Sequence, residues 1–211
     1  MNLPLNPALY LVTDTQMCGK RGVTATVRAA VAGGVTLVQL RDHIASARAL
    51  YEMTLELVAA LKGTGVPMIV NDRIDVALAA GAAGVHLGQT DLPVTRAREL
   101  AGADFLIGLS TSRAEQIAQV NALPVGTVSY IGIGPVFFTQ TKPHAATPVG
   151  IAEMAKLRGM SSVPTVAIGG IKPDNVAAVR ATGVSGVAVV SAICTAADPQ
   201  AVAVTLMSGE N

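Results

Sequence analysis

The sequence has no tryptophan, only two cysteines and few aromatic residues of any kind, which make up 3% of its 211 positions. Charge is scarce as well, since charged residues account for 14% of the chain and the formal net charge is +1. Nucleic-acid-binding surfaces are normally strongly basic, so this balance argues against a nucleic-acid partner. Cys18 and Cys194 form neither a metal-ligand spacing nor a disulfide framework, which is typical of a reducing cytoplasm.

Long apolar runs are also absent, although 51% of the residues are hydrophobic and the mean hydropathy is +0.50. Gly, Pro or polar residues interrupt every stretch of about 18 residues, so we expect no membrane-spanning helix and no membrane partner. Residues 1–14 lack the basic segment and the cleavage site of a signal peptide. The low charge and the apolar content exclude intrinsic disorder, and the length predicts one domain over residues 1–211.

What the chain does contain is an alternation of short apolar segments with helical patterns. The segments are continuously apolar, as parallel strands covered on both faces are. Between them, Leu50, Met53, Leu57 and Leu61 mark one face of a helix, while Ser112 and residues 172–175 mark two further helix starts. The predicted strands are residues 9–13, 35–40, 68–70, 84–87, 105–109, 129–133, 165–168 and 187–190.

Eight strands alternating with helices predict an α/β protein of the (β/α)8 TIM-barrel type. A doubly wound open sheet is the alternative, because alternation alone does not establish that the sheet closes. The first predicted strand is not followed by Gly-x-Gly-x-x-Gly, which disfavours a dinucleotide-binding site.

Polar residues gather at the C-terminal ends of the predicted strands, where (β/α)8 barrels place their active sites. Asp72 and Asp91 follow neighbouring strands and offer the hard oxygen ligands that suit Mg²⁺. Arg41 and Lys142 are cations able to neutralise phosphate charge. The pattern predicts a site for a metal-bound anion.

A second anion site is predicted at the ends of the last two strands. Gly169 and Gly170 end the seventh strand, and Val190 and Ser191 end the eighth, where barrels commonly hold phosphate with backbone N–H groups.

Each of these residues also has a simpler interpretation. Arg41 is able to pair with Asp42 or a helix carboxylate, and Asp72 or Asp75 to cap the helix that follows. Ser110 and Ser191 are able to begin helices, the glycine pair to form only a tight turn, and Lys142 to be solvated surface. For His86, inside an apolar segment, we favour a hydrogen-bonded structural role over catalysis.

Six motifs in order resemble the thiamine phosphate synthase family over nearly the whole chain. They are residues 38–42 (VQLRD), 70–72 (VND), 84–91 (GVHLGQTD), 132–137 (GIGPVF), 139–142 (TQTK) and 167–171 (AIGGI). The resemblance implies a (β/α)8 transferase that joins a pyrimidinylmethyl diphosphate to a thiazole phosphate and releases pyrophosphate.

The resemblance also assigns roles by position. It implies that Asp72 and Asp91 bind Mg²⁺ and that Arg41, Ser110 and Lys142 are catalytic and meet the diphosphate. The remaining implied substrate-binding residues are Gln39, Leu40, Asp42, His43 and Asn71 for the pyrimidine diphosphate, and Thr139, Gln140, Thr141, Gly170, Val190 and Ser191 for the thiazole phosphate.

The implied mechanism is dissociative: pyrophosphate departs, the aminopyrimidine supports a methyl cation, and the thiazole nitrogen captures it. Such chemistry needs leaving-group electrostatics and alignment rather than a covalent nucleophile. His43 departs from the family, which usually has Lys there, and weakens one phosphate cation. A thiazole tautomerase-like paralogue and a non-catalytic regulator that binds a thiamine precursor are the alternatives.

Overall fold

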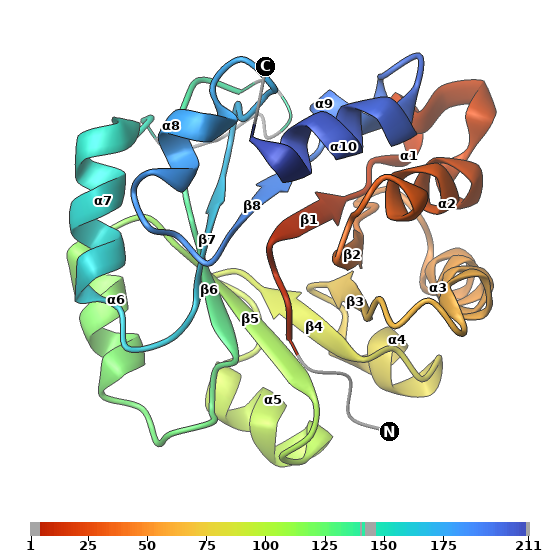
Figure 1. Cartoon of the computed structure of the whole chain (residues 1–211). Coiled ribbons are helices and arrows are strands. Elements are labelled where there is room, and N and C mark those ends of the chain that lie inside the picture. Colours follow the sequence, from red (N-terminus) through yellow and green to blue (C-terminus); the bar gives the residue numbers. More distant parts are fainter. Residues whose placement is uncertain (1–4, 140, 142–146, 210–211) are drawn as a thin grey trace.

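The computed structural model describes residues 5–139, 141 and 147–209. Within them, eight parallel strands close into a barrel, with the helices arranged around it (Figure 1). The strands are β1 (Leu9–Val12), β2 (Leu37–Leu40), β3 (Met68–Asn71), β4 (Gly84–Leu87), β5 (Leu106–Thr111), β6 (Tyr130–Ile133), β7 (Thr165–Ile168) and β8 (Gly186–Val189).

Closure is made by β1 and β8, which pair in parallel with Leu11 opposite Val189. This pairing confirms the predicted (β/α)8 barrel and rules out the doubly wound open sheet. Each observed strand lies within two residues of its predicted bounds.

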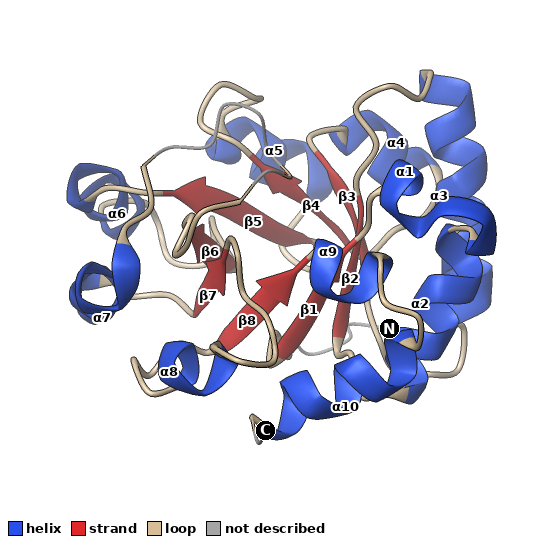
Figure 2. Cartoon of the chain, turned by 90° about the horizontal axis from the view of Figure 1, so that it is seen from above, coloured by secondary structure: helices blue, strands red, loops and turns tan. Residues whose placement is uncertain are grey.

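Helices cover the outside of the barrel, as the view from above shows (Figure 2). The helical elements are α1 (Thr15–Cys18), a 3₁₀ turn (Gly19–Arg21), α2 (Val23–Ala32), α3 (Ala47–Leu61), α4 (Ile74–Ala79), α5 (Val94–Ala101), α6 (Ala114–Asn121), α7 (Gly150–Met160), α8 (Val176–Arg180), α9 (Ser191–Cys194) and α10 (Pro199–Ser208). None of those within the described ranges is both long and apolar enough to cross a membrane.

The predicted face of α3 is buried at Leu50, Leu57 and Leu61, and the Ser46 side chain caps the helix by accepting from the Ala49 N–H at 3.2 Å. Two predicted helix starts are wrong. Helix α6 has Arg113 rather than Ser112 at its N-cap, because the Gln116 side chain accepts from both backbone N–H groups there.

Helix α8 begins at Val176, after a turn in which the Asn175 side chain accepts from the Lys172 N–H at 2.8 Å. The Pro173 ring therefore lies in the turn before the helix rather than in its first turn.

The core has two layers because neighbouring strand residues point to opposite sides. Leu11, Val38 and Val70 belong to the cluster packed under the helices, whereas Tyr10, Ile69 and Tyr130 belong to the cluster that fills the barrel. Inward positions near the C-terminal strand ends therefore carry the side chains that reach a ligand.

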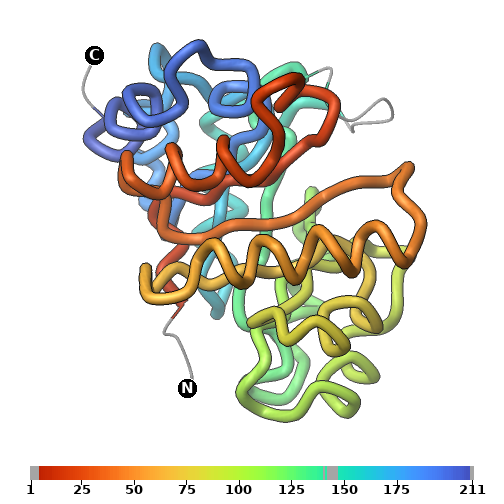
Figure 3. Tube along the Cα trace, turned by 90° about the vertical axis from the view of Figure 1, so that its right-hand side faces the viewer, coloured from red at the N-terminus to blue at the C-terminus, as the bar shows by residue number. Residues whose placement is uncertain are grey.

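Closure also brings the ends of the chain together. Helix α10 packs against α2, and Figure 3 shows the blue C-terminal segment beside the red N-terminal one. Cys18 in α1 and Cys194 in α9, distant in sequence, lie on helices that contact each other, and the neighbouring Cys194 side chain lowers the pKa of Cys18. Both thiols are free and buried.

Candidate active site

A cavity of about 530 Å³ opens at the C-terminal ends of the strands. The structure brings most of the predicted site residues into its lining: Gln39, Arg41, His43, Asn71, Asp72, Asp91, Ser110, Thr139, Thr141, Gly170, Val190 and Ser191. Gln140 and Lys142, also predicted, lie outside the described residues.

Two predicted binding residues have side chains that do not line this cavity. Leu40 points to the outer layer, where it is fully buried in the core. The Asp42 carboxylate accepts from the backbone N–H groups of Ile44 and Ala45 at 2.8 and 2.9 Å, and so shapes the loop after β2. Alternation along the strand explains both placements.

Arg41 lies at the edge of the cavity with its side chain only 14% exposed. It forms an ion pair with Asp14 at 4.0 Å, rather than with Asp42 or a helix carboxylate as the simpler interpretation had it. Burial lowers the pKa of Arg41, while the charges of Asp14, Asp72 and Asp42 oppose that shift. An arginine keeps its proton under such conditions, so the cavity contains a permanent cation close to Asp72.

Asp72 adopts a left-handed backbone conformation with φ of 59°, which is unusual for a residue with a side chain. The helix-capping interpretation is wrong for this residue, because the N-cap of α4 is Arg73 and no side chain caps it. Asp75 is paired with Arg73 at 2.6 Å. Strain of this kind is found where a site needs a particular side-chain direction.

Asp91 is held from the loop after β4. Its Oδ2 accepts from the Gly88 N–H at 2.6 Å, and a β-carbon on Gly88 would lie 3.0 Å from that oxygen. Gly88 therefore gives the carboxylate room to approach the backbone. Among the described residues no group of three or more His, Cys, Asp and Glu side chains gathers as a metal site. Asp72 and Asp91 thus form a two-carboxylate set, which fits a hard cation that takes its other ligands from water and phosphate.

The opposite part of the cavity is built from glycine and a helix start. Gly169 and Gly170 have φ of 105° and 65°, and a β-carbon on Gly170 would lie 2.6 Å from the Phe138 carbonyl oxygen. The backbone therefore bends sharply at this pair, which also lines the cavity. Ser191 is the first residue of α9, whereas Ser110 lies inside β5 and begins no helix.

A chain of side-chain hydrogen bonds crosses the barrel beneath this cavity, and sequence reasoning missed its two tyrosines. The Gln39 amide nitrogen donates to the Tyr10 hydroxyl, which bonds to the Tyr130 hydroxyl at 2.9 Å. Tyr130 contacts His86 Nδ1 at 2.9 Å, and His86 Nε2 contacts the Ser110 hydroxyl at 2.9 Å. His86 has the hydrogen-bonded role that we favoured, and it also lines the cavity. Hydroxyls at inward positions of two apolar strands were the available signal.

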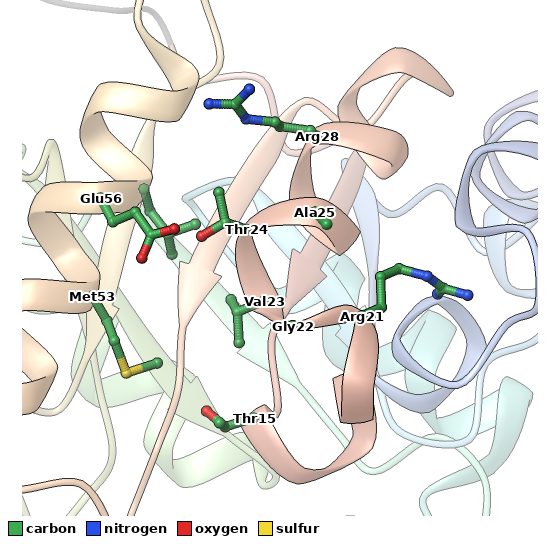
Figure 4. Close-up of a pocket in the computed structure, with 10 residues that line it drawn as sticks. Thr15, Arg21, Gly22, Val23, Thr24, Ala25, Arg28, Met53 and Glu56 are labelled. Carbon is green, nitrogen blue, oxygen red and sulfur yellow. The ribbon is translucent and has the colours of Figure 1, made fainter.

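A second hollow, of about 540 Å³, lies on the outside of the barrel between α2 and α3 (Figure 4). Arg21 is not available to a ligand there, because its guanidinium donates to the carbonyls of Ala196 and Ala197 at 2.9 Å. Figure 4 shows Arg21 pointing toward the C-terminal segment, and Thr24 and Glu56 on facing helices. This groove contains none of the predicted site residues.

A closed (β/α)8 barrel whose mouth joins two carboxylates, a largely buried arginine and a pair of glycines is the scaffold of an enzyme. A family model described as thiamine monophosphate synthase matches residues 9–193. The chain belongs to this family.

Proteins named thiamine-phosphate synthase are similar along almost their whole length. One from Azorhizobium caulinodans is 48% identical over 203 residues, covering 96% of this chain and 94% of its own. One from Laribacter hongkongensis is also 48% identical over 203 residues, with the same coverage.

Among solved structures, a thiamine phosphate pyrophosphorylase from Pyrococcus furiosus superposes with a TM-score of 0.87 and 34% identity, covering 97% of this chain and 95% of that one. A 3-hexulose-6-phosphate synthase, at a TM-score of 0.67 and 20% identity, covers 97% of this chain and all of its own, and shares the fold.

Proposed function

We propose that the chain is a thiamine phosphate synthase, a transferase that joins 4-amino-2-methyl-5-pyrimidinylmethyl diphosphate to a thiazole phosphate. The accepted thiazole is 4-methyl-5-(2-phosphooxyethyl)thiazole or its carboxylate. The bond from the methylene carbon to the diphosphate oxygen breaks, and a bond from that carbon to the thiazole nitrogen forms. Thiamine phosphate and pyrophosphate are the products. One observation supports this most directly: a single cavity joins the Arg41, Asp72 and Asp91 end to the Gly170 and Ser191 end.

The first end suits the diphosphate. Arg41 offers parallel N–H donors to phosphate oxygens, and its cationic charge favours the extra negative charge that pyrophosphate gains as it leaves. Ser110 adds a hydroxyl at the end of β5, and Lys142, which comes after β6 in the sequence, would add a second cation. Gln39 and Asn71 lie on neighbouring strands and offer amides to the pyrimidine ring.

Asp72 and Asp91 would hold Mg²⁺, whose chemistry when bound is to neutralise and orient the diphosphate. Their fit rests on the two-carboxylate set described above, with Asp91 fixed by the Gly88 N–H.

The second end suits the phosphate of the thiazole. It would accept hydrogen bonds from the backbone N–H groups of Gly170 and Ser191 and from the hydroxyls of Thr139 and Thr141. Val190 lies beside them in the lining of the cavity. Gln140 is assigned to the same proposed subsite from the sequence. Two anchored anions leave the reacting carbon and nitrogen aligned between them, which is the main contribution of such a site.

The proposal extends to the setting of the enzyme. The partners are small molecules, and residues 1–211 form one domain. The two free, buried thiols support a cytoplasmic location.

The decisive assay follows pyrophosphate and thiamine phosphate with both substrates and Mg²⁺ present. We expect both products in equal amounts, and loss of turnover in Asp72→Ala and Asp91→Ala. Asp104→Ala, an exposed aspartate before β5, is the matched control and retains turnover. Isomerisation of the thiazole without pyrophosphate would identify a tautomerase instead. Binding without turnover would identify a regulator.

A further inference from the structure

The five side chains from Gln39 to Ser110 form an unbroken hydrogen-bond chain between two residues that the proposed function places on the substrate. Tyr10 and Tyr130 are 1% and 0% exposed, and Gln39 is 3% exposed, so water does not compete for most of these bonds. The chain links β2, β1, β6, β4 and β5, from one side of the barrel to the other. The donor or acceptor role of each side chain therefore fixes the role of its neighbour.

The direction of the chain follows from counting donors. The Gln39 amide nitrogen has only hydrogens to offer, so Tyr10 accepts from it and must donate elsewhere. The other partner of the Tyr10 hydroxyl is Tyr130 at 2.9 Å, so Tyr10 donates to Tyr130.

The hydrogen of Tyr130 then goes to its remaining partner, His86 Nδ1 at 2.9 Å. An Nδ1 atom that accepts leaves the ring proton on Nε2, which donates to the Ser110 oxygen at 2.9 Å. The Ser110 hydrogen is thereby left for a ligand in the cavity.

We propose that Tyr10, Tyr130 and His86 are positioning residues that make Ser110 a hydrogen-bond donor toward the diphosphate and leave the Gln39 carbonyl oxygen as an acceptor toward the amino group of the pyrimidine. The assignment of the two ligand groups rests on the proposed function. A diphosphate oxygen only accepts, and an amino group donates, so this direction of the chain matches the substrate at both ends.

The reverse direction would defeat both contacts. If the Gln39 amide were turned over, every bond of the chain would invert, and Ser110 would spend its hydrogen on His86 Nε2. Ser110 would then present only lone pairs to an anion. The orientation of the Gln39 amide thus determines whether Ser110, on the other side of the barrel, donates a hydrogen bond to an anion.

Two further features keep the tyrosine hydroxyls of this hydrogen-bond chain protonated and leave room for them and for His86. Burial raises the pKa of Tyr10 and of Tyr130 well above the ordinary range, so both hydroxyls keep their hydrogens. Gly108 on β5 supplies the space, since a β-carbon there would lie 2.5 Å from His86 Nδ1 and would also overlap the Tyr130 hydroxyl.

The direct test reads the His86 tautomer in the ligand-free protein by ¹⁵N-detected NMR of histidine-labelled samples. The chain has three histidines, and His86→Gln assigns the signal. We expect His86 neutral, with its hydrogen on Nε2. A hydrogen on Nδ1 would overturn the proposal, whether or not the enzyme turns over, because it reverses the chain.

The kinetic test is a double-mutant cycle between Tyr130→Phe and Ser110→Ala. Tyr130→Phe removes one hydroxyl, and we expect it to raise the KM for the diphosphate substrate roughly fivefold. In the Ser110→Ala background we expect the same change to have a clearly smaller effect, because only the part of its influence that passes through Tyr10 to Gln39 remains. Tyr51→Phe, at an exposed position of α3, is the control, and we expect it to change neither kcat nor KM.

An equal effect of Tyr130→Phe in both backgrounds would show a general structural role and refute the positioning role. Thermal unfolding identifies any variant that is not folded, and Tyr10→Phe, one link further along, then takes its place in the cycle. If the wild-type protein fails to release pyrophosphate, that result counts against the proposed function alone. The His86 tautomer reports the direction of the hydrogen-bond chain whether or not the protein turns over substrate.

Discussion

The backbone N–H of Gly88 donates a hydrogen bond to Oδ2 of Asp91 at 2.6 Å, so the glycine of the loop after β4 fixes the carboxylate at the cavity. The missing side chain matters as much as the bond, because a β-carbon would lie 3.0 Å from the same oxygen. The loop thus positions one of the two acidic residues that we assign to Mg²⁺.

Gly88→Ala is expected to turn the Asp91 carboxylate away without disturbing the barrel. The φ of Gly88 is not in the positive range, so alanine causes no backbone strain. We predict that the Mg²⁺ concentration for half-maximal turnover rises about tenfold, as when a group that orients a metal ligand is lost. Thermal unfolding should stay nearly unchanged. Gly159→Ala, at a helical position with open space around it, is the control, and an unchanged Mg²⁺ dependence in Gly88→Ala would contradict the role of the loop.

Asp72 should reveal a cost in stability that the site imposes. With φ of 59°, its backbone is in a region that glycine enters freely and alanine does not. We predict that Asp72→Gly has a free energy of unfolding about 1 kcal/mol larger than that of Asp72→Ala, and therefore unfolds at a higher temperature. Both variants lose turnover, because both lack the carboxylate. Equal stabilities in thermal or urea unfolding would show that the strain is not significant.

The strands were predictable because each is a continuous apolar segment, but closure was not. It depends on the pairing of β1 with β8, which joins residues from the two ends of the chain. The same long-range contact brings Cys18 to Cys194, and no spacing rule in the sequence announces it.

Within the site, the cavity-lining residues that belong to charged or glycine-rich motifs were predictable from the sequence. The residues that hold them in position were not. Asp14, the ion-pair partner of Arg41, was not among the predicted site residues, and its carboxylate also caps α1 by accepting from the Met17 N–H at 2.9 Å. Tyr10 and Tyr130 read as core residues, since a buried hydroxyl pair is recognised only when the barrel places the two strands face to face.

His43 stands at a position where the resemblance described in the sequence analysis leads us to expect lysine. It lies exposed at the rim of the cavity. An ordinary imidazole loses its charge above a pH of about 6.5, whereas lysine keeps its charge to about 10. We therefore predict that His43→Lys lowers the KM for the diphosphate substrate, by a factor that grows as the pH rises.

The measurement is KM at several pH values between about 6 and 9, where histidine and lysine differ most in charge. His43→Gln, neutral throughout, serves as the control and should resemble the wild type at the highest pH. No tightening in His43→Lys at any pH would show that this position does not contact phosphate.

Asp42 links the stability of the loop after β2 to pH. Burial raises the pKa of Asp42, but hydrogen bonds from Thr15, Ile44 and Ala45 outweigh it, and the net pKa lies below the ordinary 3.8. A lowered pKa in the folded state means that the carboxylate stabilises the fold above pH 3.8 and that this contribution is lost as the pH falls through the lower, folded value. We predict that Asp42→Asn is less stable than wild type by about 0.5 kcal/mol at neutral pH, because solvent screens the carboxylate and the asparagine oxygen still accepts hydrogen bonds.

That difference should shrink as the pH is lowered toward the folded pKa, which urea unfolding at a series of pH values measures. Glu99→Gln, an exposed pair partner of Arg96, controls for general acid effects. A difference that is constant with pH would show that the charge of Asp42 does not matter.

Arg180 supports the end of the barrel opposite the cavity. Its Nη2 donates to the carbonyls of Ala8, just before β1, and Leu206 in α10, at 3.1 and 3.0 Å. Arg180→Ala leaves two partly buried carbonyls without their charged donor, so we predict a loss of about 2 kcal/mol and a fall in the unfolding temperature of about 4 °C. Because the residue lies at the opposite end of the barrel from the strand ends to which we assign the substrates, kcat and KM at low temperature should not change. Arg28→Ala, an exposed arginine on α2, should leave the unfolding temperature as it is, and a change in KM in Arg180→Ala would show that the two ends of the barrel are coupled.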